Sequence, residues 1–277
     1  MEHLTIGFIG GGNMAASLIG GLLEDGVVSE QIRVSDSNSE RSTLLHHRFG
    51  ITPIEDNRRL VEEVDVVILA VKPQVIADVC HEISEIVQLQ IPLIISIAAG
   101  IRASHIANWL GDKVAVVRTM PNTPAMIRTG ATALYANTHV SKRQREQAEA
   151  IMRSVGLTLW VEKEPDLDAV TALSGSGPAY LFLFIEELQL AGESLGLSAE
   201  TARLLALQTA FGATKMALES DESCATLRRQ VTSPGGTTER AIQVFESGGL
   251  QALVTSALTA ARDRARQLGD ELGDKAK

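Results

Sequence analysis

The chain has 277 residues, 45% of them hydrophobic, which is enough to form a core without disulfides or metal ions. Its 34 acidic side chains outnumber its 25 basic ones and give a net charge of -9, and no block of Lys or Arg occurs, so composition disfavours nucleic acid or an anionic membrane as a partner. Cys80 and Cys224 have no metal-binding or redox spacing, which predicts no metal site and fits a reducing cytoplasm. Uninterrupted apolar runs stay far below the ~20 residues of a bilayer span, and no basic segment precedes the first one, so we expect neither a membrane span nor an export signal.

In roughly the first 160 residues, short β-branched runs alternate with amphipathic stretches. Several of these runs are apolar at every position, which is typical of parallel strands covered by helices on both faces. The predicted strands span residues 4–9, 32–35, 64–71, 92–97, 114–118, 131–135 and 158–161.

After about residue 162 the strand-like runs end and segments rich in Leu and Ala predict an all-α half. The predicted helices span residues 179–195, 199–219, 224–230, 239–247 and 250–268, with Ser198 as an N-cap and Gly248 as a C-cap. The run 181–185 is apolar nearly all round its helix, which favours oligomerisation. We therefore predict two domains, 1–163 and 164–277, with a boundary in the charged stretch that contains Pro165.

The first predicted strand leads into a G-x-G-x-x-A motif, residues 10–15, and then into a helical stretch, residues 13–24. Gly10 permits a tight turn, Gly12 lets the backbone approach a diphosphate, and Ala15 lets helix and strand pack closely. The free N–H groups at the start of the helix suit phosphate oxygens. The motif predicts a Rossmann-type, doubly wound α/β domain that binds a dinucleotide.

Asp36 lies at the end of the second predicted strand. An acid at this place usually accepts a hydrogen bond from the adenosine 2′-hydroxyl and favours NAD(H). Hydroxyl and amide side chains at positions 35, 37 and 38, with Arg41, could instead serve the 2′-phosphate of NADP(H). Asp36 or Ser37 could also be no more than the N-cap of the next helix, so all three interpretations stay open.

Further motifs follow the predicted strands or break the helical half. Residues 70–73, 96–100 and 118–124 each follow a strand, at the edge where doubly wound sheets bind ligands. The 174–180 motif predicts a kink or a site, and the 231–238 motif an ordinary capped turn or an anion-binding turn. In the second case Gly235 and Gly236 would direct their N–H groups toward a small carboxylate at a helix start.

Taken in order, six motifs resemble the pyrroline-5-carboxylate reductases over essentially the whole chain: residues 7–14, 71–73, 96–100, 120–124, 174–180 and 233–238. The resemblance implies the NAD(P)H-dependent reduction of (S)-1-pyrroline-5-carboxylate to L-proline, the final step of proline biosynthesis, in the cytoplasm. It implies a homodimer formed by the helical domains, a possible decamer of such dimers, and an active site at a subunit junction. It favours NADP(H), whereas Asp36 departs from the small hydroxyl residue common in NADPH-preferring members and leaves NAD(H) open.

The resemblance also implies roles for particular residues. Thr238 is the expected catalytic residue, whose hydroxyl meets the ring nitrogen of the substrate. The expected substrate-binding residues are Ser176, Ser233, Pro234, Gly235, Gly236 and Thr237. The adenosine and diphosphate part of the cofactor is expected at Ile9, Gly10, Gly11, Gly12, Asn13, Met14, Ser35, Asp36 and Ser37, and the rest of it, mainly the nicotinamide side, at Asn57, Ala70, Val71, Lys72, Pro73, Ala98, Ala99, Gly100 and Asn122.

Two other functions remain compatible with a dinucleotide-binding sheet followed by helices. A β-hydroxyacid dehydrogenase would resemble families with a lysine on the long interdomain helix, and this chain has none between Lys163 and Lys215. A sensor of NAD(P)H would bind the dinucleotide without turnover. No histidine follows His139, so we expect orientation rather than a histidine acid to carry catalysis in the helical half.

Overall fold

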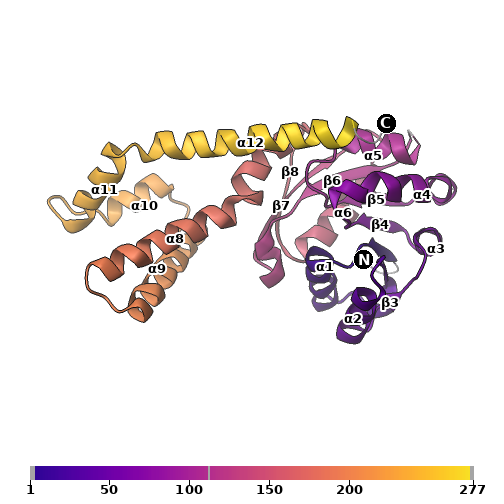
Figure 1. The fold of residues 1–277 in the computed structure, drawn as a ribbon, viewed down its shortest axis with the longest axis horizontal. Helices are drawn as coiled ribbons and strands as arrows, with labels where there is room; N and C mark the ends of the chain where they lie inside the picture. The colour runs from indigo at the N-terminus through magenta and orange to yellow at the C-terminus, as the bar shows by residue number, and fades with distance from the viewer. Residues whose placement is uncertain (1–3, 112, 275–277) are drawn as a thin grey trace. The chain divides into compact units, whose positions relative to one another are not determined.

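The computed structural model describes residues 4–111 and 113–274 and divides into two compact units (Figure 1). Unit 1 comprises Met1–Ser176 and Ala260–Lys277, and unit 2 comprises Gly177–Thr259. This division follows spatial compactness and assigns residues 164–176 to the sheet unit. The functional boundary predicted after residue 163 stays a prediction.

Unit 1 is built on an eight-stranded sheet with the order β3-β2-β1-β4-β5-β6-β7-β8. The strands are β1 (Ile6–Ile9), β2 (Ile32–Ser35), β3 (Thr52–Pro53), β4 (Val66–Leu69), β5 (Leu93–Ser96), β6 (Val116–Met120), β7 (Gly130–Ala136) and β8 (Gly156–Trp160). Each predicted strand is present with its ends shifted by up to two residues. The two-residue strand β3 was not predicted, because it is too short and too exposed to show a pattern.

The direction of β7 corrects the prediction of a parallel sheet. The strands from β3 to β6 are parallel to their neighbours, whereas β7 is antiparallel to β6, and β8 is parallel to β7. Only residues 121–129 connect β6 to β7, and a parallel return needs a crossover of a dozen or more residues. The short connection therefore reverses the chain.

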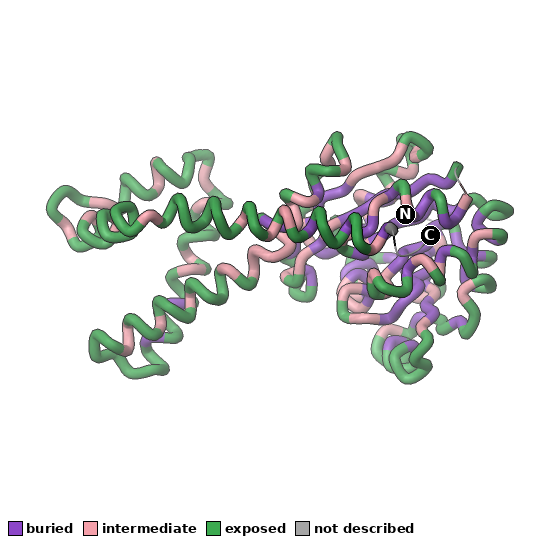
Figure 2. The backbone as a smooth tube through the Cα atoms, turned by 45° about the horizontal axis from the view of Figure 1, so that its top comes forward, coloured by how far each residue is buried: buried purple, intermediate pink, exposed green. Residues whose placement is uncertain are grey.

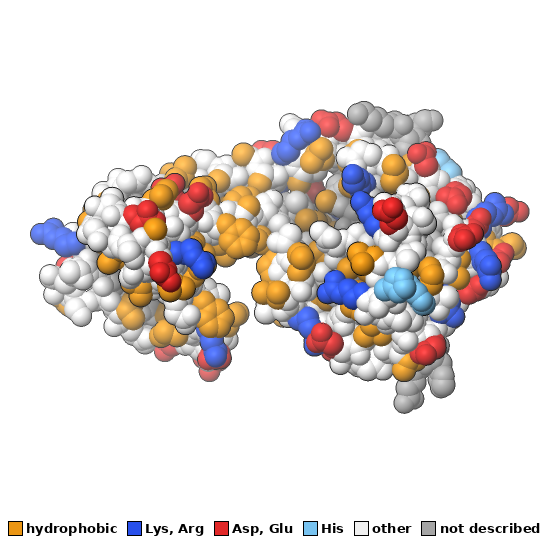
Figure 3. All heavy atoms as spheres, turned by 60° about the horizontal axis from the view of Figure 1, so that its bottom comes forward, with side chains coloured by type: hydrophobic (Ala, Val, Ile, Leu, Met, Phe, Trp, Pro, Cys, Tyr) orange, Lys and Arg blue, Asp and Glu red, His pale blue; other side chains and the backbone are white. Residues whose placement is uncertain are grey.

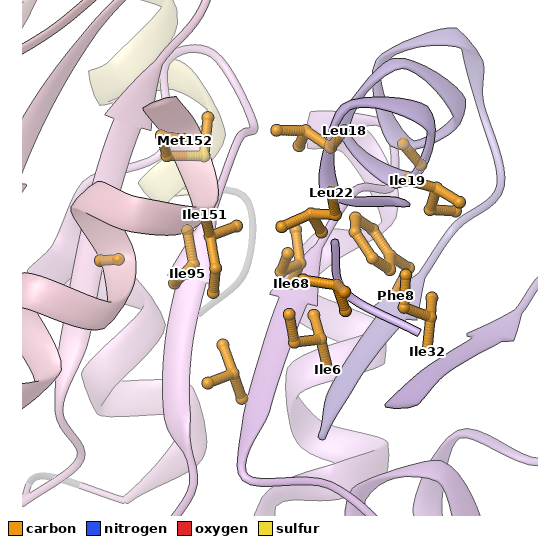
Figure 4. Packing of buried hydrophobic residues seen from close by; sticks show 14 of the residues in the cluster. Ile6, Phe8, Leu18, Ile19, Leu22, Ile32, Ile68, Ile95, Ile151 and Met152 are labelled. Atoms are coloured by element: carbon orange, nitrogen blue, oxygen red, sulfur yellow. The ribbon is translucent and has the colours of Figure 1, made fainter. Parts of the chain in front are cut away.

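Helices cover both faces of this sheet, which confirms the predicted doubly wound architecture. They are α1 (Asn13–Glu24), α2 (Ser39–Phe49), α3 (Asn57–Glu62), α4 (Ile76–Gln90), α5 (Ala103–Leu110), α6 (Lys142–Arg153) and α7 (Asp166–Val170), with 3-10 turns η1 (Ser29–Gln31), η2 (Pro73–Val75) and η3 (Thr123–Ile127) and a π-helical turn η4 (Thr171–Gly175). On one face, α1 and α6 pack against Phe8, Ile68 and Ile95 (Figure 4). On the other face, α3, α4 and α5 pack against Val67 and Ile94.

Unit 2 is all-α, as predicted. It contains α8 (Gly177–Ser194), α9 (Ala199–Glu219), α10 (Cys224–Gln230), α11 (Thr237–Ser247) and the first part of α12 (Leu250–Asp274). Ser198 caps α9 by accepting from the N–H of Thr201, and Gly248 is the C-cap of α11, so both predicted caps are confirmed. Helix α12 continues past its predicted end at residue 268 to Asp274, and its C-terminal part belongs to unit 1.

Unit 2 buries almost nothing within a single chain. Between Gly177 and Thr259 only Ala202 and Ala206 are buried, so these helices are almost entirely green and pink in Figure 2. Large apolar side chains are solvent-exposed instead, among them Phe182 at 68% and Leu218 at 81%. Hydrophobic side chains are accordingly visible on the surface in Figure 3. One chain alone gives unit 2 no hydrophobic core.

Among the residues that the structure describes, one helical stretch, Asp166–Ser194, is long and apolar enough to cross a membrane by length and composition, and little of it is buried. Length and composition alone do not make this stretch a membrane span, so the expectation that the chain has none stays a prediction. The expectation counted only uninterrupted apolar residues, whereas this stretch includes scattered polar ones. The same two properties also fit a helix that is covered by another protein surface.

Candidate active site

The predicted cofactor segments meet at one edge of the sheet in unit 1. The carboxyl ends of β1, β2 and β4 lie in register, because Ile9 pairs with both Ser35 and Leu69. Leu69 pairs in turn with Ser96 at the end of β5. Residues 10–14, 35–37, 70–73 and 98–100 therefore all leave the sheet at this edge. The strand order reverses between β1 and β4, which is where doubly wound sheets bind dinucleotides.

Gly10 makes the tight turn after β1 that the motif predicts. Its φ is +101°, and its N–H donates to the carbonyl of Ser35 over 2.7 Å. A Cβ at this position would lie 2.6 Å from the carbonyl oxygen of Ala70. Both the backbone conformation and the space therefore require glycine. Gly12 differs, since a Cβ there would meet nothing within 4 Å, so its backbone is open to a ligand.

Helix α1 begins at Asn13 without a side-chain cap. Its N-cap, Gly12, has no side chain to satisfy the first N–H groups, and the first turn holds no acidic residue. These N–H groups lack acceptors within the helix, and the helix dipole adds partial positive charge there. Asn13 is exposed and Met14 half-buried. The turn and the helix start together fit the diphosphate of a dinucleotide.

Asp36 joins two backbone turns beside this motif. Its Oδ2 accepts from the N–H of Gly11 over 2.7 Å, and its Oδ1 accepts from the N–H of Asn38 over 2.8 Å. The N-cap of α2 is Asn38, whose Oδ1 accepts from the N–H of Glu40 over 3.0 Å. The interpretation of Asp36 or Ser37 as that N-cap is therefore wrong.

Asn57 lies against the end of β2. The hydroxyl of Ser35, which is buried, donates to Oδ1 of Asn57 over 2.6 Å, and Nδ2 of Asn57 donates to Oε2 of Glu82 over 2.9 Å. Asn57 was expected on the nicotinamide side, yet its partner Ser35 belongs to the segment expected at the adenosine. Sequence reasoning missed Glu82 because it is one of several exposed carboxylates on the amphipathic helix α4.

An ion pair between buried Arg118 and half-buried Glu164 holds the end of the loop that carries Ala98, Ala99 and Gly100. Arg118 on β6 is 5% exposed, and its Nη1 donates to Oε1 of Glu164 over 3.1 Å. The same Oε1 accepts from the N–H of Ala103, the first residue of α5, over 2.6 Å. Glu164 had been interpreted as part of a charged boundary, and only the fold reveals its partners.

Asn122, which follows β6, forms hydrogen bonds with the segment just before Ser176. Its Nδ2 donates to the carbonyl and hydroxyl of Ser174, over 3.2 and 3.3 Å, and its Oδ1 accepts from the N–H of Ala131 over 2.9 Å. Ser174 lies in the π-helical turn η4, and such turns are frequent at functional sites. The structure thus brings Asn122 to the 174–180 motif. Lys72, at the N-cap of η2, is exposed, and Val71 and Pro73 beside it are half-buried.

The predicted substrate turn, residues 233–238, lies at the start of α11 in unit 2. Gly235 has a φ of +70°, and its N–H donates to Oε2 of Glu239 over 2.8 Å. The N–H of Gly236 donates to the carbonyl of Ser233 over 3.0 Å. Both glycine amides thus have partners within the turn, whereas Thr237 and Thr238 open the helix, where N–H groups have no intrahelical acceptor. A carboxylate of the protein itself, Glu239, already binds this turn.

The two halves of the chain match separate family profiles. Residues 164–268 match the profile described as pyrroline-5-carboxylate reductase dimerisation. Residues 5–100 match the profile described as NADP oxidoreductase, coenzyme F420-dependent.

Three relatives extend the match to the whole chain. The chain is 52% identical to the pyrroline-5-carboxylate reductase of Pseudomonas aeruginosa over 273 residues, which cover 99% of this chain and 100% of the relative. The structure of a pyrroline-5-carboxylate reductase from Coxiella burnetii is similar with a TM-score of 0.93 and 48% identity, covering 96% of this chain and 98% of the other. That of the Plasmodium falciparum pyrroline carboxylate reductase with NADP bound has a TM-score of 0.85 and 30% identity, covering 97% of this chain and 99% of the other.

Proposed function

The chain belongs to the pyrroline-5-carboxylate reductase family, and we infer that it reduces (S)-1-pyrroline-5-carboxylate to L-proline with a reduced nicotinamide dinucleotide. The observation that carries this inference is the 52% identity that extends along the whole chain. The dinucleotide-binding edge of unit 1 fits it, because the glycine turn and the uncapped start of α1 suit a diphosphate. Family membership favours the reductase over a hydroxyacid dehydrogenase or a sensor.

When bound, the reduced nicotinamide would supply a hydride to the carbon of the C=N bond; the nitrogen already carries its proton if the imine enters as the iminium. The residues of this chain have to hold and orient the reactants. We propose that Gly10, Gly11, Gly12, Asn13 and Met14 hold the diphosphate, and that the 70–73 and 98–100 segments support the nicotinamide. Thr238 forms a hydrogen bond with the ring nitrogen and thereby orients the imine.

The substrate carboxylate is assigned to the turn that opens α11. Main-chain N–H groups at Thr237 and Thr238 suit an anion at a helix start. The Glu239 carboxylate already accepts from the N–H group of Gly235, so the assignment depends on the N–H groups of Thr237 and Thr238. A bound substrate would compete with Glu239 for the Gly235 N–H group. Ser176 is assigned to the substrate through the resemblance.

Replacing Thr238 by alanine tests the orienting role. We expect turnover of pyrroline-5-carboxylate to fall several-fold to ~100-fold, while the dissociation constant of the dinucleotide stays unchanged. Thr214→Ala is a matched control, since the Thr214 hydroxyl donates only to the carbonyl of Ala210 in its own helix. Unchanged turnover in Thr238→Ala would remove Thr238 from the site.

We propose that the cofactor preference of this chain is shifted toward NADH by Asp36. Each oxygen of the carboxylate accepts one hydrogen bond, Oδ2 from the N–H of Gly11 and Oδ1 from the N–H of Asn38. Each oxygen has a further lone pair that can accept from a ribose 2′-hydroxyl. A 2′-phosphate would meet a like charge there instead. Steady-state kinetics of Asp36→Ser with both dinucleotides test this proposal. We expect the kcat/KM ratio of NADPH to NADH to rise about tenfold, which is about 1.4 kcal/mol. A wild-type preference for NADPH that the substitution leaves untouched would contradict it.

We propose that unit 2 pairs with a second copy of this chain. The family profile over residues 164–268 is one of dimerisation, and the exposed apolar faces of α8 supply the surface. Lipid suits this helix less well, because Glu186 and Glu187 lie next to each other in its middle, and charged side chains are costly inside a bilayer. Light scattering of the purified chain should give a dimer or an assembly of dimers, such as a decamer; a monomer would refute the pairing.

With both described cysteines unpaired and a net charge of -9, we place the enzyme in the cytoplasm, without a nucleic-acid or membrane partner.

A further inference from the structure

Three side chains form a directed hydrogen-bond relay at the end of β2. Oε2 of Glu82 lies 2.9 Å from Nδ2 of Asn57, and Oδ1 of Asn57 lies 2.6 Å from the hydroxyl oxygen of Ser35. A carboxylate can only accept, so Glu82 requires the amide nitrogen of Asn57 to face it. The amide oxygen then faces Ser35, whose hydroxyl has to donate to it. Glu82 therefore determines where the Ser35 proton points.

The same corner of unit 1 has other donors that are already in use. The N–H groups of Gly11 and Asn38 donate to the carboxylate of Asp36. Four donors near the end of β2 are thus already bound to acceptors of the protein itself: the Ser35 hydroxyl, the Asn57 amide and the N–H groups of Gly11 and Asn38. Two of the groups that take part are carboxylates, Asp36 and Glu82. A dianionic phosphate needs free donors and low negative charge, whereas a hydroxyl needs an acceptor for its proton. The corner therefore suits a ribose hydroxyl better than a phosphate.

We propose that Glu82 is a positioning residue that discriminates against the 2′-phosphorylated dinucleotide, acting through Asn57 on Ser35. This inference rests on the proposed dinucleotide-dependent reductase function. Glu82 is exposed on α4, so packing does not explain its place. In the described part of the chain no lysine or arginine forms an ion pair with it, whereas Glu85 on the same helix pairs with Arg58 over 2.7 Å. The Glu82 carboxylate is therefore free of a competing cation when it accepts from Asn57.

Two substitutions separate the relay from the rest of the site. Glu82→Gln keeps the size of the side chain, but the glutamine amide can also donate a hydrogen bond. The Asn57 amide can then turn over, and the Ser35 hydroxyl no longer has to donate to it. Glu82→Ala removes the acceptor and frees an N–H of Asn57. Glu85→Gln is the matched control, because it removes the same charge from the same helix without contact to Asn57.

The measurement is titration calorimetry of the full-length protein with NADPH and with NADH. We expect the ratio of the NADPH to the NADH dissociation constant to fall about tenfold in both Glu82 variants and less than twofold in Glu85→Gln. If both dinucleotides weaken equally, the role of Glu82 is structural and the inference is wrong. An equal change in Glu85→Gln would assign the effect to net charge and overturn the inference as well.

The reductase function is tested apart from this relay. Wild-type protein should oxidise NADH or NADPH only when pyrroline-5-carboxylate is added, and failure there would refute the reductase function itself. If that activity is present and the Glu82 variants leave the dissociation-constant ratio unchanged, only the inference about Glu82 falls. A shift with Asp36→Ser but not with Glu82→Gln would assign the discrimination to Asp36 alone.

Discussion

Removal of the Glu164 side chain should destabilise unit 1 by about 2–4 kcal/mol. Breaking a buried ion pair typically costs about 3–5 kcal/mol, because the remaining charge stays desolvated. Here the Arg118 side chain is 6% exposed, but Asp168 remains 3.9 Å from it as a second partner, which reduces the cost. The N–H of Ala103 also loses its acceptor, and an unsatisfied buried donor costs about 1–3 kcal/mol. The contributions overlap, since one oxygen of Glu164 serves both partners.

Urea unfolding monitored by tryptophan fluorescence measures this loss. The chain has two tryptophans, and both lie in unit 1: Trp109 on α5 and Trp160 on β8. Glu162→Ala is the matched control, because Glu162 is an exposed carboxylate two residues away and should change the unfolding free energy by less than about 0.5 kcal/mol. A double-mutant cycle with Arg118→Met then isolates the pairwise energy. If Glu164→Ala costs no more than Glu162→Ala, the ion pair does not fix the 98–103 loop and the argument fails.

Three further outcomes follow from particular side chains. Burial raises the pKa of the Asp168 carboxyl above 3.8, so the folded protein binds this proton more tightly than the unfolded chain does. The contribution of Asp168 to the unfolding free energy therefore falls as the pH rises from 3.8 to the raised pKa. Asp168→Asn should remove this pH dependence from unfolding curves measured across that range. Burial raises the pKa of the Cys80 thiol to about 12. In a Cys224→Ser variant, which leaves Cys80 as the one thiol, a disulfide reagent at pH 8 should therefore modify Cys80 about 1000-fold more slowly than an unfolded thiol. Rapid labelling of the folded variant would contradict this. Gly10→Ala places a Cβ against the carbonyl of Ala70 and should weaken dinucleotide binding by at least tenfold in calorimetry while lowering the melting temperature; near-normal binding would show that the turn can move.

Patterns of residues predicted most of the elements, because apolar periodicity reflects burial inside unit 1. Strand β2 and helix α1 have the predicted ends, and α9 and α10 agree as well. The direction of β7 depended on the length of its connection to β6 rather than on composition. The short strand β3 has too few residues for a pattern to exist.

The candidate site was predictable only where a motif constrains the backbone. The tight turn at Gly10 follows from the motif and the N-cap at Ser198 from its capping chemistry, whereas the contact of Gly12 with a diphosphate stays a prediction. Glu82 and Glu164 lie on an amphipathic helix and in a charged stretch, where most carboxylates are solvated. Their partners are 25 and 46 residues away in sequence, a separation that only the folded sheet brings together.

The proposed pairing of unit 2 would make its folding depend on protein concentration. If unit 2 pairs with a second copy as proposed, most of the free energy that orders these helices comes from that contact, because only Ala202 and Ala206 are buried between positions 177 and 259. Each tenfold dilution should then remove about 1.4 kcal/mol per dimer from that free energy. A newly made chain would reach its functional form only after meeting a second one, so the amount of active enzyme should rise more steeply than the amount of polypeptide when the protein is scarce.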